Sequence, residues 1–134
     1  MSSQTNVACL ADKQAIREVL DEYCLRLEVN TFEEWLALFT QDSVYEVYGK
    51  TLQGIDAIAN MLSKAPHGVH IGGPMRIELN GDRAQTVQNY AFYGEDDKYS
   101  NKGWYYRTLE RTNAGWRISH TRVEFQKPKT ESKP

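Results

Sequence analysis

The chain has 134 residues, the usual size of one domain, and a chain of this length buries roughly two-thirds of the surface that its unfolded form exposes. Its apolar fraction of 40% and charged fraction of 25% are ordinary for a globular protein. A net charge of −2 gives no field for attracting a polyanion, and no stretch approaches the roughly 18 apolar residues of a membrane-spanning helix. We therefore expect a cytoplasmic protein without a nucleic-acid or membrane partner.

The side-chain inventory favours a ligand pocket rather than a metal or disulfide framework. Cys9 and Cys24 have neither a metal-ligand spacing nor the density of a disulfide scaffold, so we expect free thiols. The chain also carries eight tyrosines, three tryptophans and four phenylalanines. Such side chains line pockets with apolar rings while offering a few hydroxyl groups.

In chain order, the first half predicts three helices and a short strand pair. Helical periodicity predicts helices over 12–28, with Asp12 as the cap, over 31–39, where Thr31 and Glu34 have the form of a capping box, and over 55–62 before Pro66. Residues 44–48 alternate as a strand that turns at Gly49 toward Leu52. Residues 1–10 are polar and irregular, and we expect a flexible tail there.

The second half predicts strands and turns only. The expected strands cover 67–71, 75–79, 83–93, 102–111 and 116–125, with Asn80-Gly81 as a two-residue hairpin turn. Helices followed by an antiparallel meander indicate the α+β class. Long twisted strands should curl around the helices into a cone-shaped barrel, a mixed and mainly antiparallel sheet that encloses one pocket. The domain should span 11–126, leaving 127–134 as a second flexible tail.

His70 is the histidine best placed to reach that pocket. It stands in a predicted strand between glycines and apolar residues, whereas His67 follows a proline and His120 lies between two arginines. A lone histidine of this kind is more often structural than catalytic. Glu28 favours the catalytic alternative, because it leaves the first helix near the buried stripe, where a carboxylate opposes the helix macrodipole. A carboxylate bonded to one imidazole nitrogen raises the basicity of the other, which gives a general base.

From about residue 12 to residue 125 the chain resembles a SnoaL-like member of the nuclear-transport-factor-2-like superfamily. The order and spacing of several short segments carry this resemblance: Ala15-Ile16 to Tyr23, Leu27-Glu28, Phe39 to Val44, Gly54 to Ile58, His70, Gly81 to Ala84, Tyr105, and Gly115 to Ile118. The superfamily includes scytalone dehydratase, hexachlorocyclohexane dehydrochlorinase, bile acid dehydratase, ketosteroid isomerase, polyketide cyclases and many non-catalytic members.

The resemblance implies roles for particular residues. In the dehydratase and dehydrochlorinase branch, a histidine after the third helix is the base and an aspartate at the end of the first helix is its partner; His70 and Glu28 match these positions. The dehydrochlorinase also has an arginine in its last strand, which corresponds to Thr121 here. Arg122 is next to it but faces the other way, so dehydrochlorination is disfavoured. Arg107 stands where relatives often carry an acid, and it either faces the ligand or pairs with Glu28.

Strand alternation assigns further side chains to the cavity. Counting every second residue from the positions that the resemblance places, we expect inward-facing side chains at Tyr45, Tyr105 and Arg107. The same count turns alternate residues from Ala84 to Phe92 inward, including Tyr90. We expect the pocket side chains to contact substrate; they are Tyr23, Tyr45, Tyr90, Tyr105, Arg107 and Thr121. Aromatic residues of curved strands are usually core, which is the structural alternative.

The first functional hypothesis is a cofactor-independent, metal-free lyase of the dehydratase type that acts on a small cyclic or aromatic hydroxy or carbonyl substrate. His70 would be the base that removes a proton, and Glu28 would be its partner. An isomerase or a cyclase that acts on a steroid- or polyketide-like ketone with the same base is the near alternative. A non-catalytic small-ligand binding domain, with His70 and Glu28 as a buried pair, is the second class. The family further implies a homodimer or homotrimer that joins through the outer sheet face, where Trp104 and Tyr106 are expected.

Overall fold

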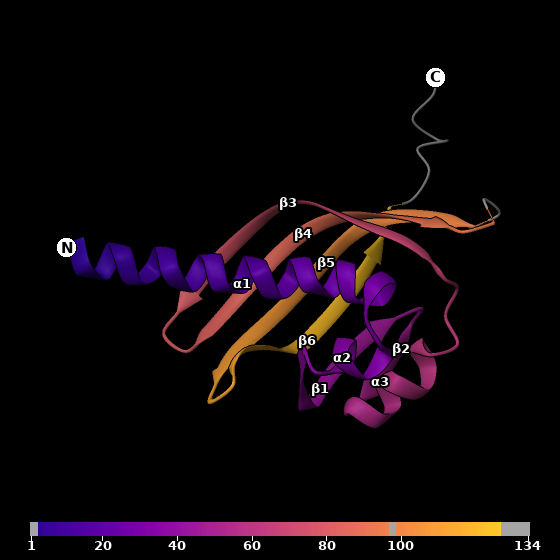
Figure 1. The fold of residues 1–134 in the computed structure, drawn as a ribbon, viewed down its shortest axis with the longest axis horizontal. Helices are drawn as coiled ribbons and strands as arrows, with labels where there is room; N and C mark the ends of the chain where they lie inside the picture. The colour runs from indigo at the N-terminus through magenta and orange to yellow at the C-terminus, as the bar shows by residue number, and fades with distance from the viewer. Residues whose placement is uncertain (1–2, 97–98, 127–134) are drawn as a thin grey trace, which may run out of the picture.

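The computed structural model describes residues 3–96 and 99–126 (Figure 1). The helices are α1 (Ser3–Val29), α2 (Phe32–Leu36) and α3 (Ile55–Leu62), and the strands are β1 (Phe39–Val47), β2 (Lys50–Gln53), β3 (Gly68–Asn80), β4 (Arg83–Gly94), β5 (Ser100–Thr112) and β6 (Gly115–Phe125). The α+β class is therefore confirmed.

The strands form one six-stranded sheet in the order β2-β1-β6-β5-β4-β3. Strands β1 and β6 run parallel, and every other neighbouring pair is antiparallel, so the sheet is mixed and mainly antiparallel as predicted. Helix α1 lies across one face of the sheet, while α2 and α3 lie beside β1 and β2 (Figure 1). The sheet does not close into a barrel, because β2 and β3 remain its two edges.

The helix boundaries differ from the predicted ones. Helix α1 starts at Ser3, so residues 3–10 are helical and not irregular. Asp12 does not cap a helix; its carboxylate accepts hydrogen bonds from the Arg111 guanidinium at 2.9 and 2.8 Å, which ties α1 to β5 while the helix continues through. Helix α2 does begin with the predicted capping box, but it ends at Leu36. Residues 1–2 and the tail expected at 127–134 lie outside the described residues.

Two strand details were also predicted wrongly. The segments expected at 67–71 and 75–79 form the single strand β3, with a register shift between Gly72 and Met75. The β3–β4 hairpin turns at residues 81–82, one position later than predicted, since Asn80 still pairs with Arg83. Gly81 takes φ 66° in this turn, a left-handed conformation that glycine adopts without a Cβ penalty.

The inner face of the sheet follows the predicted alternation. Its buried side chains include, on β4, Ala84, Thr86, Gln88, Tyr90 and Phe92, and on β5, Tyr105, Arg107 and Leu109. On the outer face, Trp104 and Tyr106 are half-buried, and the Arg122 guanidinium lies 4.1 Å from the Tyr106 ring centroid. Self-association through this face stays a prediction. Among the described helices, none is long and apolar enough to cross a membrane.

Candidate functional site

A cavity of about 380 Å³ lies between the C-terminal turns of α1, α2, the segment after α3 and the inner face of the sheet. Its volume lies within the range of small-molecule sites. The wall is largely aromatic, and its rings come from Tyr23, Phe32, Trp35, Tyr45, Tyr48, Tyr90, Phe92, Tyr99, Tyr105 and Phe125. The cavity therefore presents mainly aromatic side chains to whatever it holds.

His70 lines this cavity from β3 and is partly buried. Its ring centroid lies 4.7 Å from that of Phe92, and its Nδ1 is buried without a hydrogen-bond partner. Burial, and secondly the positive charge of Arg107, lower the pKa of His70 from 6.5 to about 4. The imidazole is therefore neutral near pH 7 and able to accept a proton.

The structure does not bring Glu28 to His70. Glu28 is exposed and does not line the cavity, and no hydrogen bond joins the two residues in the described part of the chain. The reason is helical geometry: α1 continues to Val29, and five residues of helix place Glu28 about 140° around the axis from the buried Tyr23. The predicted histidine–carboxylate pair is not formed.

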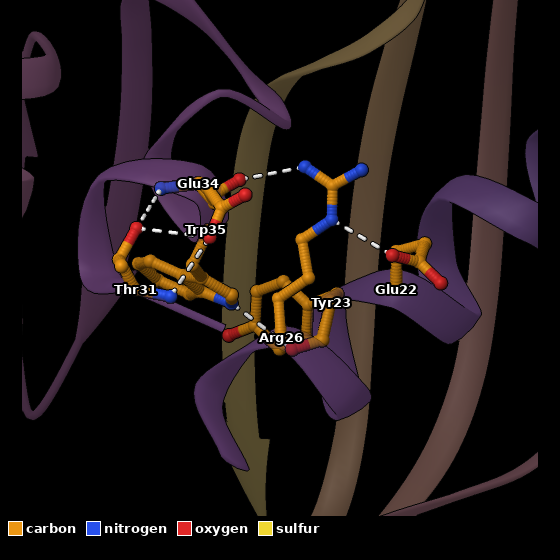
Figure 2. Close-up of polar contacts among 6 residues, drawn as sticks. All are labelled: Glu22, Tyr23, Arg26, Thr31, Glu34 and Trp35. Atoms are coloured by element: carbon orange, nitrogen blue, oxygen red, sulfur yellow. Dashed lines mark hydrogen bonds and ion pairs between the residues drawn. The ribbon is translucent and has the colours of Figure 1, made fainter. Parts of the chain in front are cut away.

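Tyr23 and Tyr45 form a buried hydroxyl pair at the cavity. Their hydroxyl oxygens lie 2.6 Å apart, and both side chains are less than 5% exposed. The indole N–H of Trp35 donates to the Tyr23 carbonyl oxygen at 3.0 Å, which holds α2 against α1 (Figure 2). Burial raises the pKa of both phenols, so both hydroxyls are protonated at neutral pH and at least one can donate to a ligand.

Tyr90 and Tyr105 complete the set of predicted tyrosines in the cavity. Their rings stack with centroids 4.3 Å apart. The Tyr90 hydroxyl donates to Asn101 Oδ1 at 2.5 Å, and Asn101 Nδ2 donates to the Tyr99 hydroxyl at 3.1 Å. The hydroxyls of Tyr99 and Tyr48 lie 3.1 Å apart. The four tyrosines predicted for the pocket, Tyr23, Tyr45, Tyr90 and Tyr105, thus line one cavity; strand alternation predicted the last three, and Tyr23 comes from α1.

Sequence reasoning missed the polar rim made by Tyr48, Tyr99 and Asn101. Tyr48 follows the end of β1, and its φ of 55° interrupts the strand, so alternation does not extend to it. Tyr99 and Asn101 follow a polar connection with no periodic signal. Their position at the cavity is seen only in the folded structure.

Arg107 and Thr121 are buried behind the cavity and do not line it. The Arg107 guanidinium carbon lies 4.2 Å from the Tyr23 ring centroid and 3.9 Å from that of Tyr105. It forms no ion pair with Glu28; its Nη1 donates to Gln88 Oε1 at 2.9 Å. Thr121 pairs in register with both Arg107 and Tyr45, and its hydroxyl is buried without a partner.

Apart from the two histidines, Arg26 is the one described lining residue with an ionisable basic side chain. Its Nε donates to the Glu22 carboxylate at 2.8 Å and its Nη1 to the Glu34 carbonyl oxygen at 2.7 Å, as Figure 2 shows. In the part of the chain that the structure describes, no aspartate or glutamate lines the cavity. Within residues 3–96 and 99–126, no group of three or more histidine, cysteine, aspartate and glutamate side chains is arranged to hold a metal ion.

A comparison with protein families matches residues 8–122 to the SnoaL-like domain. The chain belongs to this family. An uncharacterized protein of Mycobacterium tuberculosis is 28% identical to this SnoaL-like chain over 141 residues, covering 93% of this chain and 94% of the relative. The family assignment agrees with the resemblance found in the sequence.

Solved structures show the same fold. A nuclear-transport-factor-2-like protein with a cystatin-like fold from Novosphingobium aromaticivorans has a TM-score of 0.82 at 21% identity, covering 96% of this chain and 91% of that one. A candidate scytalone dehydratase from the same organism has a TM-score of 0.78 at 19% identity, covering 94% and 89%. A type 2 hexachlorocyclohexane dehydrochlorinase has a TM-score of 0.78 at 15% identity, covering 91% of this chain and 90% of that one.

Proposed function

We propose that this SnoaL-like chain is a cofactor-independent lyase of the dehydratase type, which acts on a small cyclic or aromatic hydroxy or carbonyl compound. The observation that carries the proposal is one aromatic cavity that holds a neutral histidine, His70, together with the buried hydroxyl pair of Tyr23 and Tyr45. Two proteins of similar fold are named for eliminations, a dehydration and a dehydrochlorination, which supports this reaction class.

In the proposed reaction, the neutral imidazole of His70 takes a proton from the carbon next to the substrate carbonyl. The electron pair of the broken C–H bond moves toward the carbonyl oxygen, and a hydroxyl of the Tyr23–Tyr45 pair donates a hydrogen bond to the charge that develops there. The electrons then return to form the double bond as the neighbouring C–O bond breaks. The imidazolium gives its proton to the departing hydroxyl group, so that water leaves and His70 is neutral again.

The low pKa of His70 makes the first proton transfer less favourable and the second more favourable. With a pKa of about 4, the neutral imidazole is a weak base in the first step, and the imidazolium that it forms is a correspondingly strong acid in the second. Return of the proton to the leaving hydroxyl is therefore favourable, and the first step depends on stabilisation of the oxygen by the tyrosines. Glu28 has no part in this mechanism, because it contacts neither His70 nor the cavity.

The same first step serves an isomerase, which returns the proton to another carbon, and a cyclase, which uses the enolate as a nucleophile. A non-catalytic binding domain would keep the cavity and need no base. Turnover of a panel of cyclic hydroxy-ketones by the wild type and by His70→Ala separates the enzymes from the binding domain. His120→Ala is the matched control, because His120 does not line the cavity. Its Nε2 lies 2.6 Å from a carboxylate oxygen of Glu46.

We expect His70→Ala to lower turnover by roughly 10²- to 10⁴-fold, the usual contribution of a general base. His120→Ala should keep turnover within about twofold of the wild type, since a change outside the site leaves the proton transfer intact. Equal turnover by the wild type and His70→Ala would exclude the proposed role of His70.

A further inference from the structure

Arg107 is a buried cation without a counter-charge. Its side chain is only 2% exposed, and no described carboxylate forms an ion pair with it. One of its nitrogens donates to the neutral amide of Gln88, while Nε and Nη2 are buried without any acceptor. The faces of Tyr23 and Tyr105 stabilise the guanidinium in part, but ring quadrupoles do not replace an anion. Burying an unpaired charge is costly, and such a charge calls for a compensating partner.

The cavity next to Arg107 has the properties expected of a site for an anion. Tyr23 and Tyr105 contact the guanidinium and also line the cavity, so a ligand there would be separated from the positive charge by tyrosine side chains. Among the described residues no carboxylate lines the cavity, although the chain as a whole carries a net charge of −2. The lining instead offers phenol hydroxyls, the amides of Asn30 and Asn101, and the guanidinium of Arg26.

We infer that the cavity binds an organic anion, a flat cyclic or aromatic compound that carries a carboxylate or an enolate- or phenolate-type oxyanion, and that Arg107 selects it by charge. The inference rests on the proposed function for the location of the site but not for its chemistry. Arg107 acts through the Tyr23 and Tyr105 rings and is a positioning residue. The oxyanion would take hydrogen bonds from the Tyr23–Tyr45 hydroxyl pair, while Arg107 balances its charge from behind.

Within residues 3–96 and 99–126, the titratable groups that face Arg107 supply no anion for this role. They are the phenols of Tyr23, Tyr45 and Tyr105, the Cys24 thiol and the His70 imidazole. Burial raises the pKa of Cys24 and of the three phenols, so these groups stay protonated near neutral pH, and His70 is then neutral. Since none of these described groups is negatively charged, we assign the negative charge to the ligand.

The test compares 2-naphthoate with 2-naphthamide, an anion and a neutral compound of the same shape, by calorimetric titration of the full chain. The wild type should bind the carboxylate at least about tenfold more tightly, the equivalent of about one pKa unit. Arg107→Met should abolish that preference, and Arg107→Lys should retain most of it. Arg122→Met is the matched control, because Arg122 covers the tyrosine ring of Tyr106 on the outer face.

A second arm distinguishes a phenolate from a carboxylate. Bound 4-nitrophenol is titrated by its visible absorbance, and a phenolate site should lower the apparent pKa of the bound probe by about one unit in the wild type but not in Arg107→Met. A preference for naphthoate without this shift assigns a carboxylate site; the shift without the preference assigns a phenolate site. Both results support an anion site.

Equal binding of the two naphthalene probes together with an unshifted nitrophenol pKa would overturn the inference, as would the absence of binding by every probe. The wild-type results alone decide this if Arg107→Met does not fold, and Arg107→Gln is a second charge-removing variant. His70→Gln separates this inference from the proposed function: it should lose turnover and keep the anion preference. If the preference vanishes in His70→Gln, the charge selection does not come from Arg107.

Discussion

The burial of a neutral His70 makes a quantitative prediction about stability. In the folded chain its pKa is about 4, whereas an unfolded histidine titrates near 6.5. Between these two values the unfolded state binds the proton and the folded state does not, so the free energy of unfolding falls as the pH is lowered from 6.5 toward 4. His70→Gln removes this titration while keeping a neutral polar side chain.

The size of the effect follows from the shift. A difference of about 2.5 units corresponds to about 3.4 kcal/mol in full, and roughly 2 kcal/mol of it has been lost by pH 5. Because the imidazole is partly solvent-accessible, we expect an observed loss of about 1 to 2 kcal/mol between pH 7 and pH 5 beyond that of His70→Gln.

Urea unfolding at pH 7 and pH 5 measures this difference for the wild type and His70→Gln. The other histidines contribute equally to both proteins, so the difference of differences isolates His70. The exposed His67 provides the control His67→Gln, which should keep the wild-type pH dependence. If His70→Gln loses as much stability as the wild type between the two pH values, His70 is not buried in its neutral form.

Three further substitutions test particular contacts of the site and the sheet. Glu28→Gln should keep turnover of the hydroxy-ketone panel within about twofold, because Glu28 does not contact His70; a loss above about tenfold would mean that the two residues meet during turnover. Tyr45→Phe removes one hydroxyl of the buried pair and should lower kcat by roughly 10- to 100-fold with a folded circular dichroism spectrum; an unchanged kcat would exclude this pair from oxyanion stabilisation. Gly103→Ala should cost roughly 2 kcal/mol or more in urea unfolding, because a Cβ there would overlap the Glu124 carbonyl oxygen on β6, and a loss below about 0.5 kcal/mol would contradict that geometry.

The sequence was sufficient to predict the inner face of the sheet, because a strand alternates with a period of two. Once His70 and Tyr105 were placed by resemblance, the burial of Tyr45, Tyr90 and Arg107 followed. The capping box at Thr31 was equally local, since its two hydrogen bonds depend on four consecutive residues.

Features that depend on packing between distant segments were not predictable in this way. The angle of Glu28 around α1 decided whether it reached the cavity, and a helix pattern near its C-terminal end does not fix that angle. The sequence likewise allowed Arg107 to pair with Glu28; its isolation between two tyrosine rings follows from how α1 packs on β5. Asp12 appeared to be a helix cap because its partner, Arg111, lies 99 residues away.

In the proposed reaction His70 removes a proton from carbon, and deuterium uptake tests that step most directly. Proton NMR in D₂O follows exchange at the carbon beside the carbonyl of the same cyclic hydroxy-ketones, whether elimination, isomerisation or cyclisation comes next. The wild type should accelerate loss of this proton signal at least about 100-fold over His70→Gln, in line with the loss of a general base. Equal rates of proton loss with the two proteins would contradict the assignment of His70 as the base.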